Sequence, residues 1–472
     1  MQGNRFKNLF INTILFAIGQ FGTTLLGILL VPLYTNYMTT DQYGTADLVT
    51  NLASMLLPVV TICITDGVIK FSLDGEHNIR KIFSVSFYTC LVGIVVSLAA
   101  YPLIYKYGKI PEYIVLFYLI LSTNILNNLF LAYTKALRNL KLYTGLALLR
   151  TLTMLVSNII MLTVLHAGVQ GYLFSYVIAN IVAISAAFVF NKLWQKIGIK
   201  YVDKETSKEM VLFSLPLVPN NFSGWAMSSM DKYMLTYMMG ASYNGLYTVA
   251  HKIPSVVSMF SSVFNQAWNY SALEEQKSKD HNEYYRTVFR IYSSYLFIIA
   301  SAVLCVIKPI MLVWVGDNFK QAWMYSPYLL IAIIFSCFTG FYVPLFVMAE
   351  KTNHLFISTL IGAIVNGVLN MILIPLWGIN GASLATVLTH FTVWTLRGII
   401  IEKRTEVKLD KRKAYINSIL LMAQGTLLIF SNQFWFIPQV ICLLGVLVVN
   451  KNEIVAILHR VSHMIKKVKA RK

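Results

Sequence analysis

The chain has 472 residues, of which 57% are apolar and 12% carry a formal charge. A soluble domain has about 25% charged residues, so this composition excludes a soluble enzyme. Lys and Arg nevertheless outnumber Asp and Glu by 39 to 20, which gives a net charge of +19. Such an excess indicates either nucleic-acid binding or an anionic membrane surface, and its distribution along the chain decides between them.

The apolar residues form long runs. A bilayer core of about 30 Å needs roughly 20 apolar residues per helix, and the run after the N-terminal MQGNRFKNLF is too long for a cleavable signal peptide. The sequence therefore predicts an all-α integral membrane protein with about 14 transmembrane helices. In chain order we expect them near 9–33, 44–66, 83–105, 113–134, 143–165, 171–191, 210–236, 245–268, 287–307, 326–348, 355–375, 380–397, 415–431 and 434–450.

The basic residues are divided unequally between the two sides of these spans. Thirty-two of them, with Arg290 and Arg397 counted at span edges, lie on the side of the N-terminus. The opposite side has four, and three lie within spans. By the positive-inside rule both termini are cytoplasmic. The charge excess is thus a topology signal, and no nucleic-acid partner is expected.

The C-terminal segment 451–472 has its own pattern. Apolar residues follow helical spacing from Ile454 to Val468, with basic residues between them. We expect a basic amphipathic helix on the anionic inner leaflet; the alternative is a frayed, solvated tail. The five cysteines lie apart within apolar runs, which predicts neither a disulfide framework nor a zinc site.

An internal repeat divides the chain. Gly168-Val-Gln-Gly171 recurs as Gly378-Ile-Asn-Gly381, and Tyr43-Gly44 has a counterpart in Tyr243-Asn244-Gly245. These landmarks are six spans apart, so they predict two six-helix halves in the same orientation. The expected lobes are 1–200 and 201–405, followed by two helices in 406–450. A substrate site between repeated halves is a transporter design; chance similarity of loop residues is the alternative.

The sequence contains no GxxxxGK[ST], HExxH or GxSxG motif. We therefore predict no enzyme, no metal and no organic cofactor. Transport energy would come from a substrate gradient, the membrane potential or coupling to H⁺ or Na⁺. Pro216 and Pro219 in the seventh span free backbone carbonyls, as moving helices require, although a static kink has the same pattern.

Ionisable residues inside spans are costly and so mark candidate sites. Lys252 begins a polar stripe on the eighth span, which continues through Ser255 and Ser258 to Asn265. This stripe could line an aqueous cavity and bind substrate, or Lys252 could extend to the outer headgroups. Arg150 in the fifth span could fork onto a phosphate or extend to the inner headgroups.

Three more charged residues are open to two interpretations. Asp66, near the inner end of the second span, could bind a coupling ion or pair with a nearby Lys. Asp231 and Lys232 are adjacent and cannot face each other on a helix, so an interhelical structural pair is expected. Asparagines in the fourth and eleventh spans suit sugar hydroxyls and interhelical hydrogen bonds equally. They are Asn124, Asn127, Asn128, Asn366 and Asn370.

The local sequences resemble the polysaccharide transport branch of the multidrug/oligosaccharidyl-lipid/polysaccharide (MOP) exporter superfamily, with its Wzx-type O-antigen and capsule flippases. The matching segments are Thr40-Asp-Gln-Tyr-Gly44, Gly67-Val-Ile-Lys-Phe71, Phe213-Ser-Leu-Pro216, Asp231-Lys232, Gly245-Leu-Tyr-Thr-Val-Ala-His-Lys-Ile253 and Gly378-Ile-Asn-Gly-Ala382. Lys232 departs from the Arg expected in many relatives.

The resemblance implies alternating access and flipping of polyprenyl-pyrophosphate-linked oligosaccharides, with Lys252 and Arg150 as candidate pyrophosphate contacts. It also implies membrane lipids, a polysaccharide polymerase and glycosyltransferases as partners. The alternatives are a cation-coupled multidrug exporter or a peptidoglycan-precursor flippase of the same superfamily. A membrane glycosyltransferase or polymerase is disfavoured by the short outer loops, which carry few carboxylates.

Overall fold

The computed structural model describes residues 22–75, 77–108, 110–276, 278, 280–405, 407–431 and 434–455. Throughout these residues the ordered elements are helices, with no strand. Most of the predicted C-terminal amphipathic helix and the start of the first predicted span lie outside the described residues. The described part of that first span is helical over residues 22–29.

Contacts group the chain into two units. The first contains residues up to Val249 together with Val315–Phe319, and the second contains Ala250–Trp314 and the residues from Lys320 onward. The sequence repeat places its boundary near residue 200, and that boundary stays a prediction. Residues 201–249, which the repeat assigns to the second half, thus belong to the first unit.

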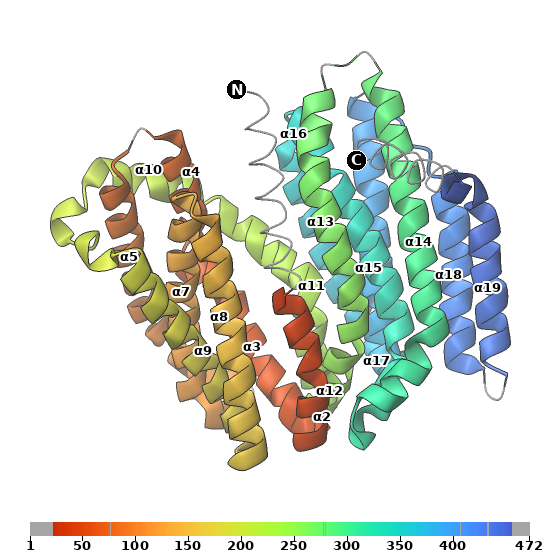
Figure 1. Cartoon of the computed structure of the whole chain (residues 1–472), viewed down its shortest axis with the longest axis horizontal. Helices are drawn as coiled ribbons and strands as arrows, with labels where there is room; N and C mark the ends of the chain where they lie inside the picture. The colour runs from red at the N-terminus through yellow and green to blue at the C-terminus, as the bar shows by residue number, and fades with distance from the viewer. Residues whose placement is uncertain are drawn as a thin grey trace, which may run out of the picture. The chain divides into compact units, whose positions relative to one another are not determined.

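In the first unit α7, α8 and α9 pack side by side, and α3 contacts α7, α9 and α11 (Figure 1). Its helices are α2 (Val31–Tyr37), α3 (Thr40–Val60), α4 (Ile64–Asp74), α5 (Ile79–Ser97), α6 (Tyr101–Tyr107), α7 (Ile114–Ala136), α8 (Leu140–Ile159), α9 (Gly168–Phe190), α10 (Lys204–Ser214), α11 (Leu217–Met239) and α12 (Ala241–Ala250). Short turns are η1 (Leu98–Ala100), η2 (Pro111–Tyr113), the π-turn η3 (Ile160–Val164), η4 (Leu193–Gln195) and η5 (Ile199–Tyr201).

In the second unit α15 packs along α17, and the C-terminal pair α18 and α19 lie side by side and contact α14 (Figure 1). Its helices are α13 (Lys252–Glu275), α14 (His281–Trp314), α15 (Ser326–Phe341), α16 (Val343–Met348), α17 (Thr352–Arg404), α18 (Arg412–Phe430) and α19 (Phe436–Val449). The turn η6 (Asp317–Met324) joins α14 to α15.

Eight of the described helical segments are long and apolar enough to cross a membrane, or nine if the bent pair α3 and α4 is one span. α17 alone covers the eleventh and twelfth predicted spans and departs from helical geometry at Gly378. The seventh and eighth predicted spans, which correspond to α11 and to α12 with α13, are more polar than these.

Three predicted spans are divided into two helices each. The second bends by 53° between α3 and α4, just after Pro58. The seventh begins after a break in which Pro216 precedes α11, and the eighth is divided at His251. Proline lacks the N–H group that helix propagation needs but fits the first turn, so each proline marks a junction.

The repeated Gly-x-x-Gly motif has the same local role in both copies. Gly168 and Gly378 have φ angles of 50° and 58°, which L-residues with side chains rarely adopt. The second glycine of each motif packs closely against the chain that precedes it. A β-carbon at Gly171 would lie 2.9 Å from the Ala167 β-carbon, and one at Gly381 would collide with the Leu373 carbonyl oxygen.

Gly381→Ala is therefore expected to lower stability by roughly 1–3 kcal/mol, because a backbone carbonyl must move to admit the methyl group. Gly224→Ala in α11 is the matched control, since its β-carbon would meet no atom within 4 Å. Thermal unfolding of the detergent-purified variants measures both. Equal midpoints for the two variants would contradict the close packing at Gly381.

Asp203, which precedes α10, connects the start of that helix to α5. Asp203 caps α10 by accepting the Thr206 N–H at 2.9 Å, and its carboxylate lies 2.9 Å from the Lys81 ammonium. The Thr206 hydrogen bond, with Lys81 adding to it, lowers the pKa of the Asp203 carboxyl to about 2. This contact therefore persists at every physiological pH.

Candidate functional site

Arg150, a predicted site residue, is held by buried amides in the first unit. Its Nε donates to Asn180 Oδ1 at 2.6 Å, and its guanidinium lies 4.9 Å from the centroid of the Tyr176 ring. Asn180 is fully buried and donates in turn to Asn124 Oδ1 at 3.0 Å and to Thr123 Oγ1 at 3.1 Å. Three helices, α7, α8 and α9, thus orient one guanidinium.

The rest of that guanidinium is available for a ligand. Among the described residues no hydrogen bond or ion pair takes up its two terminal nitrogens, and Arg150 is half-buried. A guanidinium with a fixed Nε and two open NH₂ groups presents the fork that binds phosphate or carboxylate. Tyr172 lies close enough to interact electrostatically with Arg150, and the edge of its ring contacts Tyr34, with the two ring centroids 5.0 Å apart.

Lys232, on α11, pairs with a residue that the sequence analysis did not single out. Its ammonium lies 3.1 Å from both carboxylate oxygens of Asp47 on α3. Asn51 and Asn244 also donate to Asp47 Oδ2, at 3.0 and 3.4 Å. The Lys232 and Asp47 side chains are 16% and 13% exposed, so this is a largely buried ion pair.

The neighbouring Asp231 has hydrogen-bond donors of its own. It is 2% exposed, accepts the Lys232 backbone N–H at 2.9 Å, and accepts the Tyr247 hydroxyl of α12. The adjacent charges therefore find partners on two other helices. Asp47 could have been suspected from the sequence as an acidic residue inside a predicted span, but nothing in the sequence pairs it with Lys232.

The predicted stripe that starts at Lys252 lies on α13. Lys252 is the first residue of this helix, directly after the break, and not a mid-helix residue of one long span. Ser255 Oγ and Ser258 Oγ donate to the carbonyls three residues earlier, at 2.6 and 2.7 Å. Asn265 Nδ2 lies 3.5 Å from Ser261 Oγ, and its buried Oδ1 has no hydrogen-bond partner among the described residues. The serines are thus satisfied within the helix, whereas Asn265 keeps an open acceptor.

Asp66 lies exposed in the first turn of α4. Asn221 Nδ2 is 3.5 Å from its Oδ2 and 3.2 Å from Cys63 Sγ. Arg150, Lys232, Asp231 and Asp66 belong to the first unit, and Lys252, Ser255 and Asn265 belong to the second. In the first unit Lys232 and Asp231 are sequence neighbours that contact different helices, and Arg150 and Asp66 each have separate partners.

The asparagines of the eleventh predicted span act within α17. Asn370 donates to Asn366 Oδ1 at 3.0 Å, and Asn366 lies 3.4 Å from Thr389 Oγ1 beyond the Gly378 break. Asn128, of the fourth predicted span, donates to the Asn124 carbonyl. These amides serve as hydrogen-bonding links between and within helices.

Arg397, which the sequence places at the edge of the twelfth predicted span, lies inside a longer helix. α17 continues to Arg404, and Arg397 is only 7% exposed. Its guanidinium donates to Ser358 Oγ at 3.0 Å, Thr359 Oγ1 at 3.0 Å and the Thr339 carbonyl at 2.9 Å. It thus ties α17 to α15 through neutral acceptors, and the unequal distribution of the other basic residues is unchanged.

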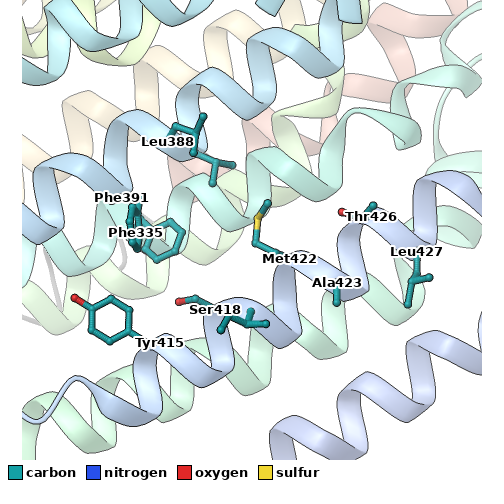
Figure 2. A pocket seen from close by; sticks show the side chains of 11 residues that line it. Phe335, Leu388, Phe391, Tyr415, Ser418, Met422, Ala423, Thr426 and Leu427 are labelled. Carbon is teal, nitrogen blue, oxygen red and sulfur yellow. The ribbon is translucent and has the colours of Figure 1, made fainter.

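A second candidate feature is apolar. A cavity of about 810 Å³ lies among α15, α17 and α18 of the second unit. Figure 2 shows Phe335 and Leu388 facing it from two of these helices and Met422 from the third. The hydroxyls of Ser418 and Thr426 are engaged elsewhere, with the Ala414 carbonyl and the Tyr328 hydroxyl. A cavity of this size falls in the range of ligand sites, and its lining suits hydrocarbon.

Comparisons with known proteins agree with this architecture. Lsg locus putative protein 1 of Haemophilus influenzae is 20% identical over 359 residues, covering 74% of this chain and 84% of that protein. The lipid II flippase MurJ in an inward closed conformation aligns with a TM-score of 0.66 at 15% identity, over 94% of this chain and 99% of the MurJ chain.

An inward-facing multidrug resistance MATE family transporter of the MOP superfamily aligns with a TM-score of 0.62 at 14% identity, over 81% of this chain and 98% of that chain. These likenesses establish the fold, an all-α multi-pass membrane architecture that this chain shares with a flippase and a transporter. The family described as polysaccharide biosynthesis protein matches residues 9–269, more than half of the sequence. The chain therefore belongs to the polysaccharide biosynthesis protein family.

Proposed function

We propose that this chain is a flippase that moves polyprenyl-pyrophosphate-linked oligosaccharide repeat units, of O antigen, capsule or exopolysaccharide, across the bacterial cytoplasmic membrane by alternating access. The observation that carries the proposal is Arg150, whose guanidinium is held through Nε by buried amides while its terminal nitrogens form no hydrogen bond to the part of the chain that the structure describes. Such a fork fits a phosphate or a carboxylate group, and a pyrophosphate offers the first of these. Family membership supports a substrate from polysaccharide biosynthesis.

The rest of the substrate would meet other features. The apolar cavity among α15, α17 and α18 would accept part of a hydrocarbon chain. Lys252 and Ser255 at the start of α13, and Asn265 with its open acceptor, are the second candidate contact set. Both termini would be cytoplasmic, and coupling to H⁺ or Na⁺ would be one source of energy. Glycosyltransferases would act before the flipping step and a polymerase after it.

The test is a strain that lacks this chain and has no redundant flippase. Lipid-linked repeat units should accumulate on the inner leaflet and surface polysaccharide should disappear. Arg150→Ala should reduce complementation at least tenfold at normal protein level, since a charged hydrogen bond contributes about 1.5–3 kcal/mol. Lys141→Ala, at an exposed position of the same helix α8, is the matched control and should complement fully.

Normal surface polysaccharide in the deleted strain would overturn the proposal. If the purified protein instead exported organic cations, the multidrug alternative would hold. If it moved lipid II, the peptidoglycan-precursor alternative would hold.

A further inference from the structure

A polar pocket of about 430 Å³ lies in the second unit, between the first turns of α14 and the segment that leads into α18. Three of its lining residues are basic, namely Arg286, Arg290 and Lys408, and two are acidic, Glu283 and Asp410. The apolar cavity among α15, α17 and α18 has a different lining. A volume of this size falls in the range of ligand sites, so the charged groups of the pocket decide what it can bind.

The segment between α17 and α18 is anchored by its alternating sequence. Val407 and Leu409 are buried, whereas Lys408 and Asp410 are exposed and line the pocket. Successive side chains of an extended segment point to opposite sides, so the two apolar residues hold the segment while the two charged residues face the pocket. The Lys408 carbonyl accepts the Arg286 Nε–H at 2.6 Å, and this hydrogen bond ties the segment to α14.

Arg286 is thereby oriented for a ligand. Its Nε is occupied, and its two terminal nitrogens have no hydrogen bond or ion pair within the part of the chain that the structure describes. A guanidinium held in this way can donate two parallel hydrogen bonds to one phosphate group. Arg290 is four residues further along α14, so it lies on the same face of the helix and brings a second guanidinium to the pocket.

Arg290 is only partly neutralised by the protein. Its Nε lies 3.6 Å from Glu453 Oε1, and the Lys413 ammonium of α18 contacts both oxygens of the same carboxylate at 2.8 Å. A single carboxylate, 5% exposed, thus faces two cations, which leaves one positive charge in excess beside the pocket. Because the Arg290 side chain is 46% exposed, its guanidinium remains accessible to a ligand.

The two carboxylates of the pocket have local partners. Asp410 Oδ1 accepts the Arg412 N–H at 3.2 Å at the start of α18, and Glu283 Oε1 lies 3.5 Å from Thr287 Oγ1 on α14. Among the described residues neither carboxylate forms an ion pair with a basic residue of the pocket. Their remaining lone pairs can accept hydrogen bonds from hydroxyl groups. The pocket therefore combines donors for a phosphate with acceptors for hydroxyls.

We propose that this pocket binds the head group of an anionic glycerophospholipid of the phosphatidylglycerol type. The phosphate accepts hydrogen bonds from Arg286, Arg290 and Lys408, and the glycerol hydroxyls donate to Glu283 and Asp410. The two carboxylates repel ligands with several negative charges, such as a nucleoside triphosphate, and tolerate a single phosphodiester.

The position of the pocket favours a lipid over a phosphate from solution. It lies where the ninth and thirteenth predicted spans begin, near residues 287 and 415, on the side that the positive-inside rule predicts to be cytoplasmic. Basic pockets between membrane helices on this side bind anionic head groups, and α14 and α18 contact each other. The bound lipid would connect α14 to the start of α18. It is a membrane component, so the proposal does not depend on the transported substrate.

The unfolding midpoint of the full-length, detergent-purified protein, titrated with dioctanoyl phosphatidylglycerol, tests the proposal. A ligand that binds the folded state raises the midpoint. Dioctanoyl phosphatidylcholine has the same chains and phosphate but neither hydroxyls nor net charge, and it should bind at least tenfold more weakly. Inorganic phosphate should neither raise the midpoint nor displace the lipid. Equal affinity for the two lipids would overturn the proposal, and so would displacement by phosphate, which would assign the pocket to a soluble anion.

Two variants and a control locate the binding. Arg286→Gln removes the fork and should weaken phosphatidylglycerol binding at least tenfold. Lys408→Gln should weaken it about threefold to fivefold, as for an exposed charge pair, and should keep the lipid-free midpoint because only the Lys408 carbonyl has a described hydrogen bond. Arg404→Gln removes an exposed cation at the end of α17 that does not line the pocket, and should bind like the parent.

Equal losses for Arg404→Gln and Lys408→Gln would show a general attraction of basic residues to anionic lipid and overturn the site. Unchanged affinity in Lys408→Gln would overturn it as well, even if Arg286→Gln failed to fold.

Discussion

Arg397→Lys is expected to destabilise the protein more than Arg397→Gln, although Lys conserves the charge. Arg397 donates three hydrogen bonds to three neutral oxygens, from Ser358, Thr359 and the Thr339 carbonyl. The three donors of a lysine ammonium lie on one nitrogen and cannot span the acceptors that Nε, Nη1 and Nη2 of Arg397 reach separately. Lysine would therefore leave acceptors without a partner beside a localised buried charge, whereas glutamine removes the charge and keeps two donors. Because each buried acceptor that loses its partner costs about 1–3 kcal/mol, the Lys variant should lose roughly 3 kcal/mol or more.

The unfolding midpoints of the detergent-purified variants measure this difference. Arg404, exposed at the end of the same helix α17, supplies the control, and its Lys and Gln variants should match the parent protein. A Lys variant at position 397 as stable as the parent would mean that positive charge, and not the planar hydrogen-bonding fork, is what this site requires.

The membrane spans could be predicted from hydropathy and charge because both are properties of single residues and do not depend on which helices pack together. Burial in lipid requires about 20 apolar residues per helix, and the spans after residue 80 coincide with α5 to α9 within a few residues. The breaks at His251 and between α3 and α4 could not be placed so well. Proline identifies a weak point in a helix, but the bend depends on the neighbouring helices that replace the lost hydrogen bonds.

The candidate site was predictable only in part, for a related reason. The adjacency of Asp231 and Lys232 shows that each needs a partner elsewhere, but the partner of Lys232 is 185 residues away in Asp47. The sequence ends the twelfth predicted span at Arg397, while α17 continues to Arg404. Buried charges reveal that a partner exists; only the fold identifies it.

Replacing only Asp47 or only Lys232 should lower the free energy of unfolding more than replacing both residues together. Lys232→Met would leave the Asp47 carboxylate with amide donors only, and Asp47→Leu would leave a largely buried ammonium. Breaking a buried ion pair costs about 3–5 kcal/mol, and the residual exposure of 16% and 13% favours the lower end of that range. The double variant removes both charges, so its loss should be clearly smaller than the sum of the single losses.

A double-mutant cycle on unfolding free energy gives this coupling directly. The comparison pair is Lys81 and Asp203, whose side chains are 45% and 30% exposed, and its coupling should be about 1 kcal/mol or less. Lys232→Arg should keep the Asp47 contact, since the guanidinium reaches the same carboxylate with a forked geometry. Equal couplings for the two pairs would mean that water reaches Asp47 freely and that the pair adds little to the contact between α3 and α11.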